Sequence, residues 1–309
     1  MKNFIYITNK FKFYDGIGIP VFSDVWNHFI NYIQLIYMKK RKLPSECLNR
    51  ENRKEKLVVS LTTFPKRIHT VEVAIKSIMC QTVKPDKIIL WLSKEQFGEM
   101  IPDNLRFYVE KGLTVRFCED DLKSHKKYFY ILKEQKKELI VTIDDDLIYP
   151  ENLLESLLIK HKDYPNAVVC YRGREMFLDD EKKVAEYWRW QIVTEEGVER
   201  PSYLIMPSTG AGTLYPPDAV NDKVFDVDIL KKYAFSTDDI WLKFMELLNL
   251  TPVIKTHKNV RYLSEIKTKE DERLLNINIV QGKNDEVVKN LSKLFPEALQ
   301  KIKEIGEGV

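Results

Sequence analysis

The chain has 309 residues, of which 44% are hydrophobic, and a formal net charge of +3. This length and apolar content are enough for one large domain, or one domain with appendages, around a sizeable core. The 49 basic and 46 acidic residues nearly balance and are spread along the chain, which argues against nucleic acid as a partner.

Four cysteines, Cys47, Cys80, Cys118 and Cys170, are far apart and form no C-x-x-C pair. Their spacing indicates neither a zinc site nor a disulfide framework, so we expect a reducing compartment. No signal peptide is predicted at the start, and the most apolar segment, residues 21–38, contains too many polar residues for a membrane span. We therefore expect a cytoplasmic protein, either free or held at the inner face of the cell membrane.

Residues 1–55 differ in composition from the rest of the chain, being rich in aromatic residues at first and then basic from Lys39 onward. Apolar residues such as Val25, Phe29 and Ile33 recur at helical spacing, which predicts an amphipathic helix that ends in a basic cluster. Three roles stay open for its apolar face: packing on the main domain, contact with a membrane surface, or contact with another subunit.

From residue 57 onward, short apolar runs rich in β-branched residues alternate with helical patterns. Runs of this kind predict strands that are covered on both faces, and four alternations predict an α/β fold with a parallel, doubly wound sheet. Thr70 is the expected N-cap of the first helix. The expected strands are at residues 57–64, 87–93, 113–117, 139–143 and 167–171, and the expected helices begin near residues 70, 127, 151, 240 and 286. A short apolar run from residue 253 precedes His257.

Three adjacent aspartates, Asp144 to Asp146, follow the apolar strand at residues 139–143. In open α/β sheets, ligands gather beyond the carboxyl ends of the strands. Adjacent carboxylates repel one another and need a cation, a basic partner or protonation, and oxygen ligands select Mg²⁺ or Mn²⁺. A helix cap before Pro150 is the alternative interpretation, but one aspartate would be enough for it. We predict a divalent metal site.

Two later segments also carry candidate functional residues. The small residues Gly210-Ala211-Gly212 let a backbone approach a ligand closely or form a tight turn. Asp238 and Asp239 precede a strongly apolar helix, where a carboxylate acts either as a helix cap or as a catalytic base. Of Trp188 and Trp190, we expect at least one to lie in the core, although tryptophan faces also bind sugars.

The segment after the first strand excludes two classes of nucleotide-binding protein. It contains neither G-x-G-x-x-G nor a Walker signature, so dinucleotide enzymes and P-loop NTPases are set aside.

Taken together, these residues resemble the GT-A class of nucleotide-sugar glycosyltransferases, and more closely the bacterial inverting enzymes, related to the large family 2, that build capsule, lipopolysaccharide and other surface glycans. The resemblance covers about residues 57–260. It rests on four segments in this order: the first strand through Thr62-Thr63-Phe64-Pro65-Lys66-Arg67, the D-x-D element Asp144-Asp145-Asp146, the strand with Gly210-Ala211-Gly212, and Thr237-Asp238-Asp239.

The resemblance implies a role for each of these segments. Asp144 and Asp146 would hold the ribose edge and the metal, and Asp239, with Asp238 beside it, would be the base on the acceptor. His257 is implied as a further metal ligand or as a structural histidine. Lys126 and Lys127 lie where the family carries a basic residue, although the usual Ala-Arg-Asn context is missing. The residues implied in nucleotide-sugar binding are Thr62, Thr63, Phe64, Arg67, Lys127, Asp144, Asp145, Gly210, Ala211 and Gly212.

The expected function is transfer of a sugar from a nucleotide-sugar donor, most simply a UDP-sugar, to a hydroxyl of a glycan or lipid-linked acceptor, with inversion and with Mn²⁺ or Mg²⁺, in bacterial polysaccharide biosynthesis. The expected organisation is an N-terminal extension at residues 1–55, a GT-A domain at 56–265, and a C-terminal loop and helix at 266–309. The oligomeric state stays open.

Three other functions are possible for a chain with some of these features. A sugar-1-phosphate nucleotidyltransferase would need a Gly-rich, Arg-bearing loop after the first strand. A non-catalytic sugar-binding module would not need acids at both sites. A phosphatase would use a strand-end aspartate but would leave Asp238 and Asp239 without a role.

Overall fold

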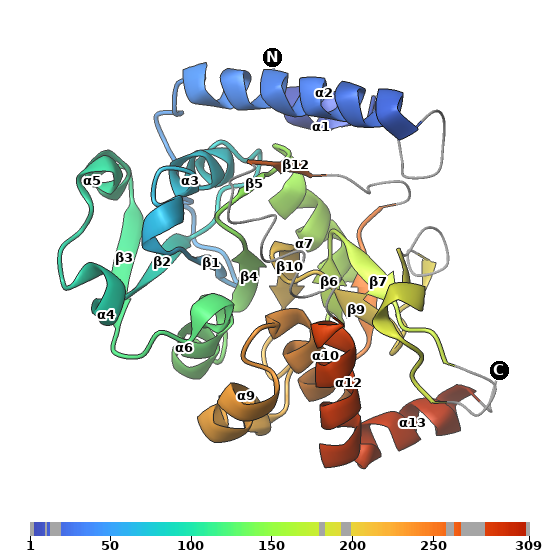
Figure 1. Ribbon diagram of the computed structural model, residues 1–309. Helices are drawn as coiled ribbons and strands as arrows, with labels where there is room; N and C mark the ends of the chain where they lie inside the picture. The colour runs from blue at the N-terminus through green and yellow to red at the C-terminus, as the bar shows by residue number, and fades with distance from the viewer. Residues whose placement is uncertain are drawn as a thin grey trace.

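The computed structural model describes residues 3–9, 11–12, 20–178, 183–192, 199–257, 263–266 and 282–306. Their centre is a seven-stranded sheet with helices on both faces (Figure 1). The strands of this sheet are β1 (Leu57–Thr62), β2 (Lys87–Ser93), β3 (Leu113–Cys118), β4 (Leu139–Ile143), β6 (Val168–Cys170), β10 (Ala211–Tyr215) and β11 (Val253–Lys255).

The strand order is β11-β6-β10-β4-β1-β2-β3. The chain runs from β1 to β2 and β3 on one side and then returns to β4 on the other side of β1. All neighbouring strands are parallel except β10, which is antiparallel to both β4 and β6. The predicted mostly parallel α/β sheet is therefore confirmed, and its topological switch point lies between β1 and β4.

Alternate residues of each central strand face two separate hydrophobic clusters, as the period of two along a strand requires. Val58 of β1 packs on the face covered by α6 and α10, whereas its neighbour Val59 packs on the face covered by α3 and α7. The larger helices are α3 (Val71–Met79), α5 (Asp103–Glu110), α6 (Lys126–Glu134), α7 (Leu153–Asp163), α9 (Val227–Tyr233), α10 (Asp238–Leu248), α12 (Lys283–Leu294) and α13 (Pro296–Gly306).

The structure also contains shorter strands and helical turns outside the seven-stranded sheet. Strands β5 (Leu147–Ile148) and β12 (Ser264–Glu265) form one pair, and β7 (Gly173–Glu175), β8 (Gln191–Ile192) and β9 (Ile205–Pro207) form a three-stranded sheet. The short helical turns are α4 (Lys94–Phe97), η1 (Pro65–Arg67), η2 (Lys123–His125), η3 (Tyr187–Arg189) and η4 (Asp222–Phe225).

The N-terminal extension forms α1 (Phe4–Asn9) and α2 (Pro20–Lys40), which lie across the top of the molecule in Figure 1. Ile5 and Met38 are buried against the main domain. The Glu151 carboxylate accepts the backbone N–H of Ile5 at 3.1 Å and Nη1 of Arg41 at 3.0 Å. The extension therefore packs on the main domain through apolar contacts and a buried carboxylate.

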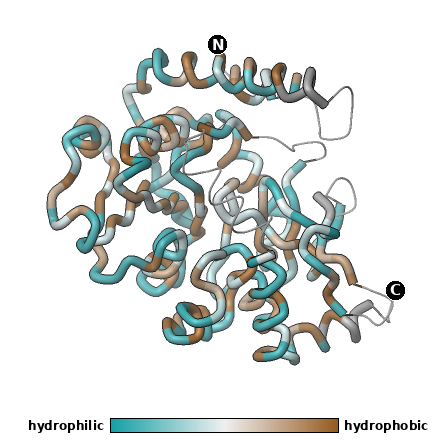
Figure 2. Tube along the Cα trace, in the orientation of Figure 1, coloured by the Kyte–Doolittle hydropathy of each residue, from teal (hydrophilic) through white to brown (hydrophobic). Residues whose placement is uncertain are grey.

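The opposite face of α2 has apolar side chains in solvent. Val25, Phe29 and Tyr32 are exposed, and apolar and polar residues alternate along this helix (Figure 2). Among the described residues, no helix is long and apolar enough to cross a membrane.

Several local predictions can be compared with the structure. Thr70 precedes α3 as expected, but its hydroxyl donates to the Arg67 carbonyl at 2.8 Å instead of capping the helix. Trp190 is buried and Trp188 is 73% exposed, so one of the two lies in the core.

At the C-terminus, two helices replace the single expected one. They meet at Pro296, whose ring prevents one continuous helix. The predicted polar loop before them falls mostly on residues 267–281, outside the described residues.

Candidate active site

The carboxyl ends of β1 and β4 bring the first group of predicted residues together. Thr63 Oγ1 donates to Asp145 Oδ2 at 2.5 Å, and Arg67 Nη1 donates to Asp145 Oδ1 at 2.9 Å. The same Arg67 nitrogen lies 3.0 Å from Asp146 Oδ2. Both oxygens of Asp145 thus have protein partners, while the side chains of Asp144 and Asp146 are 40% and 21% exposed. The outer two aspartates of the triplet are the ones able to meet a ligand.

Lys127 of α6 connects this triplet with the second acidic pair. Its Nζ atom is buried and lies 2.6 Å from Asp144 Oδ1 and 2.8 Å from Asp238 Oδ2. Burial opposes the charge of Lys127, but the two carboxylates outweigh burial and raise its pKa. The neighbouring Lys126 pairs with Asp121. Of the two lysines named from the sequence, Lys127 is therefore the one that contacts the aspartates of the candidate site.

Asp238 and Asp239 open helix α10, and Thr209 holds both. The Thr209 backbone N–H donates to Asp239 Oδ1 at 2.9 Å, and its hydroxyl oxygen lies 2.5 Å from that atom and 2.6 Å from Asp238 Oδ2. Thr209 is in place because β10 is antiparallel, so that the residues before this strand lie at the carboxyl edge of β4.

The two acids of this pair titrate differently. Burial opposes ionisation of Asp238, but Lys127 outweighs burial and lowers the pKa of this carboxyl. For Asp239, burial and then the charge of Asp238 raise the pKa to about 6. An ionised, half-buried carboxylate with a pKa near neutrality has the properties of a general base.

The small residues at 210–212 make room for protein side chains. A Cβ atom at Gly210 would lie 1.6 Å from Asp144 Oδ2, so the carboxylate of Asp144 occupies the space of a side chain. Gly212 has a φ of +94° and would meet Leu153, and Ala211 is buried opposite Ile143. The structure therefore explains both glycines by packing, and their role in nucleotide binding stays a prediction.

The remaining predicted residues border the site. Thr62 Oγ1 donates to the Trp91 carbonyl at 2.8 Å, and the guanidinium of Arg67 lies over the Phe64 ring at 5.4 Å. His257 is half-buried just after β11. Within the described residues, no three His, Cys, Asp or Glu side chains form a group that could hold a metal. Asp144, Asp146 and His257 are therefore not a preassembled ligand set.

The charges of the site nevertheless fit a divalent cation. Burial, and then the charge of Asp144, raise the pKa of Asp146 to about 7, which means that its negative charge is poorly compensated. Magnesium and similar ions bind through one or two carboxylates together with phosphate oxygens of a substrate. Two basic residues, Arg67 and Lys127, face five acids, namely Asp144, Asp145, Asp146, Asp238 and Asp239.

Two hydroxyl residues of the site had no role assigned from the sequence. The Tyr149 hydroxyl accepts the Asp144 backbone N–H at 2.8 Å and donates to the Gly210 carbonyl at 2.5 Å. Thr209 holds both acids of α10. In the sequence, only their positions point to the site: Tyr149 ends the segment that contains the aspartates, and Thr209 directly precedes the two glycines.

Solved structures share this architecture. A mannosyltransferase from Pyrobaculum calidifontis, PcManGT, in complex with GDP-Man and Mn²⁺, is 14% identical over 91% of this chain and 77% of that chain, with a TM-score of 0.50. This chain has the GT-A fold. The predicted fold is thereby confirmed, and the acids at the β1–β4 switch point lie where an open α/β sheet binds ligands.

Two other structures resemble the GT-A sheet of this chain less closely. Staphylococcus aureus TarS 1-349, in complex with UDP-GlcNAc, is 16% identical over 67% of this chain and 57% of that chain, with a TM-score of 0.45. A 4-diphosphocytidyl-2C-methyl-D-erythritol synthase is 12% identical over 72% of this chain and 99% of that chain, with a TM-score of 0.40. No protein-family model and no curated protein sequence matches the chain.

Proposed function

We propose that the protein is a metal-dependent glycosyltransferase that moves a sugar from a nucleotide-sugar donor to an acceptor hydroxyl. The observation that carries the proposal is the pair of acidic sites on the two sides of Lys127, whose Nζ contacts both Asp144 and Asp238. Sugar transfer needs charge stabilisation for the departing nucleoside diphosphate and a base for the attacking hydroxyl. The fold shared with PcManGT supports this reaction class.

Each group of side chains has one task in this reaction. Asp144 and Asp146 would hold Mn²⁺ or Mg²⁺, and the ion would neutralise charge on the leaving diphosphate. Arg67 and Thr63 keep Asp145 turned inward and so orient the segment. Asp239 accepts the proton of the acceptor hydroxyl. Direct attack assisted by one base inverts the configuration at the anomeric carbon.

The finer assignments rest on the sequence resemblance. They are a UDP-sugar donor, an acceptor hydroxyl on a glycan or lipid-linked sugar, a cytoplasmic location, and a role in a bacterial surface polysaccharide such as capsule or lipopolysaccharide. Release of nucleotide from a panel of UDP- and GDP-sugars, with Mn²⁺ present, identifies the donor.

The main alternative, a sugar-1-phosphate nucleotidyltransferase, would release pyrophosphate from a nucleoside triphosphate and a sugar phosphate. The end of β1 argues against it, because the chain there enters the Pro65–Arg67 turn, which contains no glycine.

Nucleotide binding is expected to depend on a divalent ion. Without one, the diphosphate would face the carboxylates of Asp144 and Asp146, so EDTA should weaken UDP or GDP binding by at least about tenfold, or 1.4 kcal/mol. Calorimetry with Mn²⁺ and with EDTA measures this difference, and Asp146→Ala should remove it. Asp163→Ala, which changes an exposed aspartate at the end of α7, is the control. Equal affinity in Mn²⁺ and EDTA would contradict the metal site.

The outer face of α2 supports a further part of the proposal, contact with the inner face of the cell membrane. Val25, Phe29 and Tyr32 recur at helical spacing and are exposed, and the helix ends in the exposed pair Lys39 and Lys40. An apolar stripe beside basic residues is the pattern of a helix that lies in the plane of an anionic membrane.

Co-sedimentation with phosphatidylserine-containing vesicles tests this contact. We expect the double variant Phe29→Glu/Tyr32→Glu to bind these vesicles at least about tenfold, or 1.4 kcal/mol, more weakly than the unmodified chain does. The control is Phe107→Glu, at an exposed phenylalanine on α5. Unchanged vesicle binding by the double variant would refute the contact. If instead the unmodified chain and the Phe107→Glu control self-associate with rising concentration and the double variant does not, the face would be assigned to a second subunit.

A further inference from the structure

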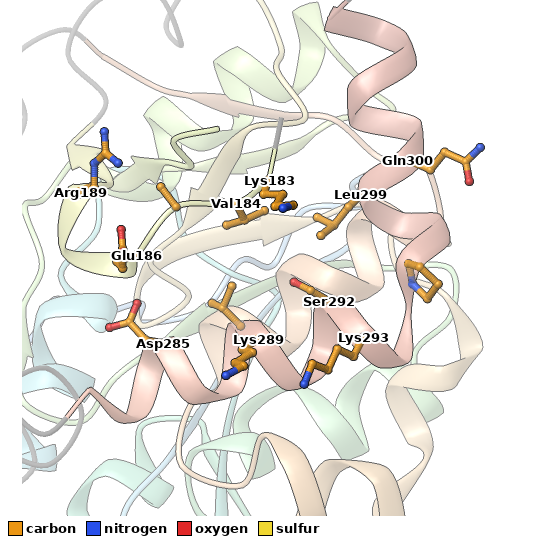
Figure 3. Close-up of a pocket in the computed structure, with 13 residues that line it drawn as sticks. Lys183, Val184, Glu186, Arg189, Asp285, Lys289, Ser292, Lys293, Leu299 and Gln300 are labelled. Carbon is orange, nitrogen blue, oxygen red and sulfur yellow. The ribbon is translucent and has the colours of Figure 1, made fainter. Parts of the chain in front are cut away.

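A large cavity lies between the segment around residues 183–189 and the C-terminal helices. Its volume is about 1010 Å³. One wall is the segment that contains η3, and the other is formed by α12 and α13 (Figure 3). Val184, Val288 and Leu299 give it an apolar lining. Small-molecule pockets span roughly 300 to 1,000 Å³, so this cavity suits an extended ligand better than a single sugar.

Four of the six charged residues that line the cavity are basic, and the other two are Glu186 and Asp285. Lys289 and Lys293 are exposed, and their spacing of four residues places them on one face of α12. In the ranges that the structure describes, neither forms an ion pair. Lys183 and Arg189 add two cations from the opposite wall. At the end of the cavity near η3, the acidic Asp285 is already engaged, because it accepts the backbone N–H of Tyr187 at 2.5 Å.

The same end of the cavity is close to the candidate base. Helix α12 packs against η3 and against α10, which begins with Asp238 and Asp239. Tyr187 of η3 is half-buried, and burial together with the charge of Asp239 raises the pKa of its phenol. Tyr187 therefore lies within electrostatic reach of Asp239. A chain that extends from the cavity past Tyr187 would approach the base.

We propose that this cavity binds the acceptor, and that the acceptor is an anionic glycan, a saccharide or polyol chain that carries phosphodiester or carboxylate groups. The inference rests on the proposed glycosyltransferase function and names its acceptor class. Lys289 and Lys293, about 6 Å apart along the helix axis, meet successive negative groups of the chain. The carbon faces of the units lie on the apolar lining, and Trp188, in the neighbouring turn η3, has an exposed ring that could bind a further unit.

Calorimetry with the full chain and three tetrameric probes tests the inference. The probes are an oligogalacturonate with carboxylates, a glycerol phosphate oligomer with phosphodiesters, and neutral maltotetraose. We expect one anionic probe to bind at least about tenfold (1.4 kcal/mol) more tightly than maltotetraose, and its binding to weaken as salt rises. The anionic probe that binds identifies the charged group.

Charge reversal locates the site. Lys289→Glu/Lys293→Glu should abolish binding of the anionic probe, and Lys289→Gln/Lys293→Gln should reduce it. Lys231→Glu/Lys232→Glu, at two exposed lysines on the neighbouring helix α9, should not. Binding of UDP or GDP with Mn²⁺, measured on the same preparations, separates the two proposals.

Three outcomes would overturn the inference. They are equal affinity for anionic and neutral probes, absence of binding by both anionic probes while nucleotide still binds, and anionic binding that survives the Lys289→Glu/Lys293→Glu change. If the unmodified chain does not bind UDP or GDP in the presence of Mn²⁺, the result would instead count against the proposed function itself.

Discussion

Replacing Asp239 by asparagine is expected to lower the rate of sugar transfer by about 10² to 10⁴, the usual contribution of a general base. Asparagine is nearly isosteric and can still accept the hydrogen bonds from Thr209, but it cannot take the proton of the acceptor hydroxyl. Nucleotide affinity should stay the same, because the hydrogen bonds of Asp239 come from Thr209, whereas the ion pairs of Lys127 are with Asp144 and Asp238.

The measurement is initial-rate kinetics with the identified donor, together with calorimetry of nucleotide binding. Asp228→Asn is a matched control, because Asp228 is an exposed carboxylate in the first turn of another helix, α9. A near-normal rate of transfer by Asp239→Asn would mean that Asp239 only caps helix α10 and is not the base. A product that retains the anomeric configuration of the donor would contradict direct displacement.

The pKa of Asp239 adds a pH dependence to the same prediction. Because burial and Asp238 raise this pKa to about 6, the base is ionised at neutral pH and becomes protonated as the pH falls through that value. The rate should therefore decline on acidification through pH 6. The residual rate of Asp239→Asn should lack this decline.

Replacing Lys127 by methionine is expected to destabilise the fold by roughly 3 to 5 kcal/mol, the usual cost of removing one partner from a buried ion pair. Most of the loss arises at Asp238, which is buried, since solvent screens the more exposed Asp144. Urea unfolding of the intact chain and the variant gives the difference.

The loss of unfolding free energy in Lys127→Met should depend on pH. Lys127 lowers the pKa of Asp238, so the pair contributes stability above the ordinary carboxyl pKa of about 3.9, and this stability is lost as the pH falls. The variant should therefore differ most from the parent at neutral pH and least in acid.

A second substitution supplies the control for Lys127. Lys127→Met/Asp238→Asn should recover much of the lost stability, because removing both charges leaves no uncompensated ion. Lys126→Met tests specificity: Lys126 is equally buried but pairs with Asp121, so this variant should retain Mn²⁺-dependent nucleotide binding. An unchanged urea midpoint for Lys127→Met would contradict the bridging role.

Much of the fold could be predicted from local patterns. The runs Leu57–Thr62 and Leu139–Ile143 are apolar and β-branched because both of their faces are covered, and a run of this kind identifies a central strand wherever it occurs. The acids at the end of β4 and at the start of α10 were equally visible, since charged residues beside an apolar run stand out by composition. Such features depend on residues close together in the chain.

The connections between these segments could not be predicted in the same way. Lys126 and Lys127 are neighbours of the same type, and successive residues of a helix point about 100° apart. Which one faces the acids depends on how α6 packs against β1 and β4. Similarly, the antiparallel direction of β10 brings Thr209 beside Asp239, and no local pattern in residues 205–215 specifies that direction.

The sequence by itself therefore determined the alternation of strands and helices and the identity of the acidic segments, because hydrophobic periodicity and charge are properties of neighbouring residues. Only the tertiary structure decided that Asp145 is turned inward onto Thr63 and Arg67, that Gly210 makes room for Asp144, and that Lys127 joins Asp144 to Asp238. These contacts link residues from separate elements of the chain. Their geometry follows from the packing of whole helices against the sheet, which brings distant charges together and thereby sets their pKa values.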